Sequence, residues 1–476
     1  MRIHHVLHRR APERVDRPLA VLLLAIAFGT VPHASVRLVW ISAALIVVCT
    51  ETAHAQERDA ARTLDSLVAR AIVVHPQIAV AEARAAAARA RIGPAGSRPD
   101  PMLMAGLQNF PVSDPGFADF MTMKMVGVEQ VFPYRGKRAL RTAVARTDAR
   151  AAELSLEADR RQIARQVREA YYDVVEARLV LENLARQQSL LSDLVPAADV
   201  QYASGDGDLR KALIVRQEAA AIAVEAASAR ENERAALARL NSALDQPSDA
   251  DLSAAAAFPF RVLRAAGADA GGGGVAPATL GDRIPDSPLL PLDSIQQLAV
   301  SHNAMLQAHE ATIDAQRADV ALAQRAHLPD IGLSVGYAHR SGFTDMVTAT
   351  VSVPLPVQRG RVQNQQVAEA RAELLAREAE HHAVGTAIRA EVARLVAELE
   401  SQRTQLALLN SVVLPLDRAT VDVTVAAFRA GRADLSSVLS GYGALFRTET
   451  KTVQAIARVG RTLAMLEEMT GMEVLR

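Results

Sequence analysis

The chain has 476 residues, of which 50% are hydrophobic, only 4% are aromatic and 22% are charged, and its formal net charge is zero. Many small apolar residues with few aromatic rings favour long, closely packed helices over a thick globular core. The neutral balance lacks the basic excess of a nucleic-acid-binding protein, and the single cysteine, Cys49, excludes a disulfide framework and a cysteine metal site.

The first 55 residues are typical of an export signal. Arg37 precedes an apolar run at 38–48, and small residues around Ala55 provide a cleavage site before Gln56. The apolar run is too short to cross a membrane as a helix. We therefore expect residues 1–55 to be an N-terminal extension with a Sec signal peptide, and the mature chain to be exported.

The rest of the sequence carries one pattern twice. Residues 63–91 and 291–319 begin alike, with TLDSLVARAIVVHPQIAVAEA and PLDSIQQLAVSHNAMLQAHEA. Each copy continues with two short alternating segments, a basic turn containing glycine, and two helical stretches. Since the period of about 230 residues is too large for a solenoid unit, we expect two structural halves at 56–245 and 291–476. The Ala/Gly/Pro-rich segment 246–290 is expected to be a flexible connector.

The alternating segments predict β-strands. Residues 331–338 and 347–353 alternate apolar with small or polar side chains at a period of two. The first half offers 101–109 and 120–131, in which we expect Lys124, together with Thr122, to lie on the wet face. Each segment has about the ten residues that a tilted strand needs to cross a bilayer.

Four strands cannot close a barrel, and open strand edges are not tolerated in lipid. We therefore expect the chain to oligomerise, and three copies would supply twelve strands. A soluble protein with an ordinary hairpin sheet is the alternative.

A long helix is predicted after each basic turn. Residues 137–195 contain neither Gly nor Pro, and apolar or small residues recur with a period of 3.5 from Ile163 and again from Ile388. One helix over 137–202 would be about 100 Å long, at about 1.5 Å per residue. Such helices must pack lengthwise against one another or against neighbouring chains.

Prolines and glycines shape the far ends of these helices. Pro196 and Pro415 should each kink the helix or restart it. Gly205 and Gly431 then turn the chain back into shorter antiparallel helices. The two halves are therefore expected to end in long helical hairpins.

Taken in this order, the residues resemble the outer-membrane factor family, the TolC-like exit ducts of Gram-negative efflux and type I secretion systems. The resemblance covers about 60–471 and includes the duplication, the strand–strand–turn–helix order and the helix breaks YASG and FRAG. It also includes the helix ends ALARLNSAL and LAMLEEMTG. The turn FPYRGKR after GVEQV is more similar to the heavy-metal-efflux, CzcC-like branch.

This resemblance implies a mainly α fold with a transmembrane β part. It further implies a homotrimer with a 12-stranded outer-membrane β-barrel, continued by a long periplasmic coiled-coil α-barrel. Partners would be outer-membrane lipid, a periplasmic adaptor protein and a proton-driven inner-membrane pump. The chain would then be the passive exit duct for heavy-metal cations or small toxic compounds. A duct for peptide or protein secretion and a poreless exported coiled-coil scaffold are the alternatives.

No catalytic motif is found. The sequence has no Gly-rich phosphate loop, no G-x-S-x-G elbow and no H-E-x-x-H helix. We expect no enzyme activity, no catalytic residue and no cofactor, we assign no metal ligand, and we expect no nucleic-acid partner.

The helix-hairpin tips resemble the adaptor-contact region of the family. Glycine and alanine there permit the close backbone approach that tip-to-tip docking requires, and a role of the same glycines as helix C-caps is compatible with it. The expected contact residues are Tyr202, Ala203, Ser204, Gly205, Phe428, Arg429, Ala430 and Gly431.

Charged residues just past the tips are candidates for a pore gate, because a trimer repeats each of them as a ring of three and carboxylate rings favour cations. The family commonly places gate carboxylates about two turns further along the second returning helix, where this chain has serines. Asp434 is a possible substitute, and a solvated helix N-cap is the alternative. The candidate gate residues are Asp206, Asp208, Arg432, Asp434, Ser437 and Ser440.

Five methionines, Met102, Met104, Met121, Met123 and Met125, alternate in the first strand pair. Thioethers suit Cu(I) or Ag(I), whereas methionines on the lipid side of a barrel need no metal.

The turn that opens the first long helix is expected at the periplasmic membrane boundary, where cationic and aromatic side chains anchor a protein. A solvated turn is the alternative, and the two do not conflict. The residues concerned are Tyr134, Arg135, Lys137 and Arg138.

Overall fold

The computed structural model describes residues 63–112, 116–117, 119–203, 209–250, 252 and 289–472. All of them belong to the second of two compact units, which starts at Gln56. The predicted signal peptide and most of the predicted connector lie outside the described residues.

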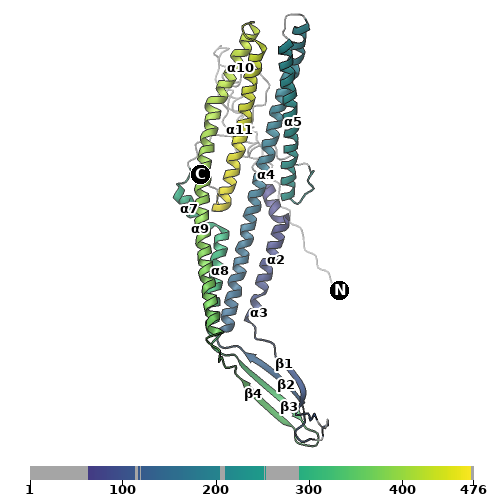
Figure 1. Cartoon of the computed structure of the whole chain (residues 1–476), viewed down its shortest axis with the longest axis vertical. Coiled ribbons are helices and arrows are strands. Elements are labelled where there is room, and N and C mark those ends of the chain that lie inside the picture. The colour runs from purple at the N-terminus through teal and green to yellow at the C-terminus, as the bar shows by residue number, and fades with distance from the viewer. Residues whose placement is uncertain are drawn as a thin grey trace, which may run out of the picture. The chain divides into compact units, whose positions relative to one another are not determined.

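Both halves of the described chain have the same order of elements (Figure 1). After a helix at Thr63–Val74, the first half contains α2 (Pro76–Ala90), α3 (Ile92–Gly96), β1 (Met102–Gln108), β2 (Met123–Phe132), α4 (Lys137–Ala203) and α5 (Leu209–Ala243). The second contains α7 (Leu292–His302), α8 (Ala304–Arg325), β3 (Ile331–His339), β4 (Met346–Ser352), α9 (Gln363–Leu408), a π-turn (Leu409–Val413), α10 (Leu414–Arg429) and α11 (Leu435–Thr470).

The opening helices of the two halves are interrupted at equivalent positions, His75 and Asn303. His75 caps α2 by accepting the Gln77 N–H, and Asn303 caps α8 by accepting the Leu306 N–H at 3.1 Å. Side-chain acceptors at this position satisfy amide groups that the first helical turn leaves free. No single described helix is long and apolar enough to cross a membrane, although Thr63–Val74 and Pro76–Gly96, bent by 50°, meet that test as a pair.

The predicted long helix is confirmed. Helix α4 runs unbroken for 67 residues, and Pro196 lies inside it without ending it. At about 1.5 Å per residue this helix is about 100 Å long. The equivalent path in the second half is interrupted, because α9 ends at Leu408, a π-turn follows, and α10 restarts with Pro415 in its first turn. The path therefore stays helical past Pro415, and the irregularity is the π-turn that precedes this proline.

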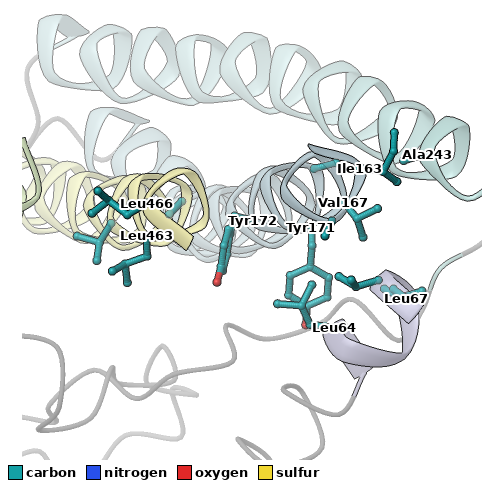
Figure 2. Packing of buried hydrophobic residues seen from close by; sticks show 14 of the residues in the cluster. Leu64, Leu67, Ile163, Val167, Tyr171, Tyr172, Ala243, Leu463 and Leu466 are labelled. Atoms are coloured by element: carbon teal, nitrogen blue, oxygen red, sulfur yellow. The ribbon is translucent and has the colours of Figure 1, made fainter. Parts of the chain in front are cut away.

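Helix α4 is the centre of the packing and contacts α2, α3, α5, α8 and α11. The predicted apolar seam is buried: Ile163, Val167 and Val174 on α4 are fully covered, as are Val392 and Leu399 on α9. Figure 2 shows Ile163 and Val167 beside Tyr171 and the end of α5. Burying one such aliphatic side chain stabilises the fold by about 1.5–3 kcal/mol, so this seam is a main source of helix–helix adhesion.

Two adjacent tyrosines of α4 complete this core. The rings of Tyr171 and Tyr172 meet edge to face, with centroids 6.2 Å apart (Figure 2). Burial raises the pKa of Tyr171 to about 12, although the Arg178 charge opposes that rise. Burial also raises the pKa of Tyr172, and both phenols are therefore neutral at physiological pH.

The four strands form one antiparallel sheet in the order β1-β2-β3-β4, which confirms the expected strand segments and the mainly helical fold with a four-stranded sheet. Pairing of β2 with β3 joins the two halves, and β1 and β4 are the edges. The sheet lies beyond one end of the helical part, where α3 ends and α4 begins (Figure 1).

Candidate functional site

The register gives the sheet two chemically different faces. The first, called the apolar face here, exposes its side chains by 42% to 75%. Its large residues are Leu103, Leu107, Val126, Val128, Ile331, Leu333, Val335, Tyr337, Val347 and Val351. Monomeric soluble proteins rarely expose so continuous an apolar surface. This face is therefore suited to contact with lipid or with another protein.

The opposite side, called the polar face here, is built from small and polar residues together with methionines. Glycines fill much of its centre, and a Cβ on Gly332 would meet the Ser352 hydroxyl and the Glu129 carboxylate, so these side chains reach across it. Its larger members are Gln108, Glu129, Val131, Ser334, Thr348, Thr350 and Ser352, with Met102, Met104, Met123, Met125 and Met346.

The prediction for Lys124 and Thr122 is wrong. Lys124 pairs with Leu107 and His339, which places it on the apolar face, and its Nζ lies 4.4 Å from the centre of the Phe117 ring. Thr122 precedes β2, is buried, and donates its hydroxyl to the Asn109 carbonyl at 3.1 Å. The pairing of β2 with the strongly alternating β3 decides the face, and it puts the even-numbered residues of β2 with the apolar side chains.

The turn predicted at the membrane boundary joins several elements. Lys137 is buried and its Nζ donates to the Asp330 carboxylate at 2.8 Å, which also accepts the Tyr134 N–H at 2.8 Å. Arg138 Nε donates to the Gly96 carbonyl at 2.8 Å. Burial alone would raise the pKa of Asp330, but these hydrogen bonds and the Lys137 charge outweigh it and hold the pKa below its usual range.

Glycine is required within this turn. Gly136 has a φ of 93°, which L side chains rarely adopt, and a Cβ there would collide with the Arg325 guanidinium. Arg325 in turn donates to the Arg135 carbonyl at 2.7 Å. The basic turn therefore holds the start of α4 against the end of α8, while Tyr134 remains partly exposed.

The tip of the second helical hairpin is a tight glycine cap. Gly431 has a φ of 67°, its N–H donates to the Phe428 carbonyl, and the Arg432 N–H donates to the Ala427 carbonyl at 2.9 Å. This is the double hydrogen bond of a Schellman motif. Phe428 is half-buried beside the core of the first hairpin, whereas Arg429, Ala430, Gly431 and Arg432 are exposed.

Asp434 is the N-cap of α11. Its carboxylate accepts the Ser437 N–H at 3.0 Å, the Ser437 hydroxyl at 2.6 Å and the Ser436 hydroxyl at 2.9 Å. The helix N-cap that was the alternative interpretation of Asp434 is therefore present in the structure. Asp434 and Ser440 are both exposed. In the first hairpin, α4 ends with Tyr202 and Ala203, while Ser204, Gly205, Asp206 and Asp208 lie outside the described residues.

A row of ion pairs between α4 and α11 was not anticipated from the sequence. Arg165 contacts Glu468 at 2.5 Å, Arg461 contacts Asp173 at 2.6 Å, and Arg186 contacts Glu449 at 3.0 Å. The residue numbers of the paired side chains rise along α4 as they fall along α11, so the two helices run antiparallel. The sequence held one signal for these ion pairs, the two adjacent acidic residues of the motif LAMLEEMTG, which need basic partners when the helix packs.

Buried amides fix the register of α11 against α4 and against α9. Asn183 is 2% exposed and donates to the Phe446 carbonyl at 2.9 Å and to the Thr450 hydroxyl at 2.7 Å. Gln402, within the predicted seam of α9, accepts the Thr462 hydroxyl at 3.1 Å. Polar groups at seam positions specify register, because any slip leaves them buried without partners.

This fold is that of solved outer-membrane channels. It matches the outer-membrane channel OprN with a TM-score of 0.70 and 16% identity, over 86% of this chain and 90% of that one. It also matches VceC from Vibrio cholerae (TM-score 0.68, 18% identity, 86% and 96% covered) and the CmeC channel of Campylobacter jejuni (TM-score 0.68, 12% identity, 86% and 85% covered).

Residues 295–472 match the family described as outer membrane efflux protein, so the second half of the chain carries the sequence pattern of that family. The matched residues lie within 60–471, the span over which the sequence resembles the TolC-like family. No curated protein matches the sequence.

Proposed function

We propose that this chain is the outer-membrane exit duct of a tripartite efflux system. The observation that carries the proposal is the two-faced sheet. One face carries large apolar side chains that are exposed, and the opposite face is small and polar, whereas a soluble hairpin sheet buries its apolar face. Transmembrane barrels have this arrangement, with apolar side chains toward lipid and polar ones toward the lumen.

Closure of the barrel requires further copies of the chain. Within the described residues, β1 and β4 each pair on one side only. Because an open edge is not tolerated in lipid, the edge strands of neighbouring copies pair, and three copies close twelve strands. Helices of about 100 Å then continue the duct into the periplasm as a coiled-coil barrel of the homotrimer.

The hairpin tips are the proposed contact with a periplasmic adaptor. Arg429, Ala430 and Gly431 are exposed around a compact glycine turn, and they are joined in this role by the first tip at Tyr202–Gly205. The candidate gate groups follow the turns, with Asp434 serving both as a cap and as the carboxylate nearest the second tip. Energy comes from the inner-membrane pump, which we propose to be proton-driven.

The proposed cargo is heavy-metal cations or small toxic compounds, in line with the CzcC-like turn FPYRGKR. A type I secretion duct shares this fold, and an ATP-driven exporter encoded beside the gene would favour it. The scaffold alternative is disfavoured, because an exported coiled coil needs no sheet with a continuous exposed apolar face.

Planar-bilayer conductance of the purified protein, together with its mass in detergent, tests the proposal. We expect a trimer with small, rarely open conductance. Asp434→Asn keeps the cap and removes the charge, so it should raise open probability if Asp434 closes the duct. Asp422→Asn, an exposed acid on α10, is the matched control. A monomer that dissolves without detergent and conducts nothing would overturn the duct.

A further inference from the structure

Methionines are distributed unevenly between the two faces of the sheet. Five of the chain's 11 methionines, Met102, Met104, Met123, Met125 and Met346, share the polar face. Among the described strand residues, the apolar face has none and uses leucine, valine, isoleucine and aromatic side chains instead. Methionines that serve as flexible filler toward lipid would lie on the apolar face, so that explanation fails.

Two of these methionines, Met104 and Met125, lie beside glycines in the middle of the polar face. Met104 is paired with Gly127 and Met125 with Gly106, which makes the two methionines diagonal neighbours across β1 and β2. Diagonal residues on one face of a sheet are about 7–8 Å apart, within joint reach of two methionine side chains. The Met125 sulfur lies 3.8 Å from the position that a Cβ on Gly336 would take.

The patch of five methionines also has a charge. Met102 pairs with Glu129, and Met123 pairs with Gln108. The ends of the patch are open, since Met102 is 54% exposed and Met346 is 42% exposed. The Glu129 carboxylate lies next to Gly332 on β3, so it adds negative charge to the same face and attracts a cation without surrounding it with hard oxygen ligands.

We infer that this patch is a binding site for soft monovalent cations, Cu(I) or Ag(I), on the lumen wall of the proposed duct. Thioethers select such ions over Zn²⁺, Mg²⁺ or Ca²⁺. Within the described ranges, no group of three or more His, Cys, Asp and Glu could hold a metal ion. Several weak thioether sites in series also suit conduction, which needs binding that is easily reversed. The inference rests on the proposed function, which makes the polar face the lumen.

Binding of Ag(I) by the mature protein in detergent tests the site. Equilibrium dialysis against silver nitrate uses the chain from Gln56 onward, which lacks Cys49, the only cysteine of the sequence. The test variant replaces the five methionines of the patch by leucine, a volume-conserving change that removes the sulfur. The control replaces Met305 and Met472, which are exposed and lie outside the sheet.

We expect the leucine variant to lose the bound silver, and the control to retain it. X-ray absorption at the silver edge should show sulfur neighbours in the parent and the control alone. Equal binding by all three proteins would overturn the inference. So would a leucine variant that loses thermal stability but no silver, because the methionines would then only pack over the glycines.

Conductance separates this inference from the proposed function. A protein that conducts K⁺ and is blocked by Ag(I) only when the methionines are present supports both. A protein that conducts K⁺ with no methionine-dependent silver effect keeps the duct and refutes the site. Methionine-dependent silver binding by a non-conducting protein keeps the site and refutes the duct.

Discussion

Gly460 provides a sharp test of how α11 packs on α4. A Cβ at Gly460 would stand 2.8 Å from ring carbons of Tyr172, closer than any real contact of that kind. Tyr172 is only 6% exposed and lies within the main core, so its ring cannot swing into solvent. Gly460→Ala must therefore shift one of the two helices.

The size of the effect follows from two opposing terms. Replacing glycine by alanine within a helix gains about 0.8–1.0 kcal/mol, whereas overpacking a closed core costs about 1–3 kcal/mol. Gly441, in the same helix, is the control, because its Cβ would meet Val421 at an ordinary 3.6 Å. The helix term cancels between Gly460→Ala and Gly441→Ala, so their unfolding free energies should differ by about 1–3 kcal/mol.

Urea unfolding measures this difference. The only tryptophan, Trp40, lies in the predicted signal segment, so helix loss is best followed by far-ultraviolet circular dichroism. We expect a lower midpoint for Gly460→Ala than for Gly441→Ala at unchanged slope. Equal midpoints would refute the packing of Gly460 against Tyr172.

Three further predictions use the same urea titration. The pKa of Asp330 is lowered, so the stability that this carboxylate contributes is fully present above the usual aspartate pKa of about 3.9. It is lost as the pH falls through the lowered pKa. Asp330→Asn should therefore lower the urea midpoint at neutral pH and flatten the dependence of the midpoint on acid pH. An unchanged acid profile would contradict this. Burial raises the pKa of Asp148 and of Asp319, and the Asp148 charge raises the pKa of Asp319 further. The contribution of these two carboxyl groups to stability is therefore present below a pH of about 3.9 and is lost as the pH rises through the raised pKa values. Asp148→Asn should therefore raise the midpoint at neutral pH and leave it unchanged in acid, and a gain at both pH values would contradict this reasoning. Asp434→Ala should cost about 0.5–2 kcal/mol through loss of the helix cap while Asp434→Asn costs little, and equal losses would argue against capping.

The sequence predicted the elements better than the orientation of β2. The duplication, the long helix 137–202 and the irregularity near Pro415 could be read from local pattern, because helices and their irregularities depend on neighbouring residues. In β2 both sets of alternate residues include apolar side chains, with Met123, Met125 and Val131 on one face and Val126, Val128 and Phe132 on the other. Its own alternation therefore cannot decide the face, and the error at Lys124 followed.

The ion pairs between α4 and α11 could not be predicted for a different reason. Arg186 and Glu449 lie 263 positions apart, and each taken alone is typical of a solvated helix face. The side chain of Glu449 is nevertheless only 7% exposed, and Arg418 approaches it from α10 at 3.8 Å. Buried charge of this kind is decided by which helices meet, and that is a property of the tertiary fold.

The two halves of the chain differ in their long helices. Proline has no N–H to donate and its ring presses on the carbonyl four residues earlier. The second half relieves this before Pro415 with a π-turn at Leu409–Val413, whereas α4 continues through Pro196 as one helix. A π-turn inserts an extra residue and rotates all that follows it relative to what precedes it. The residues that follow the π-turn in the second hairpin are therefore rotated relative to α9, whereas α4 has no such insertion between Lys137 and Ala203.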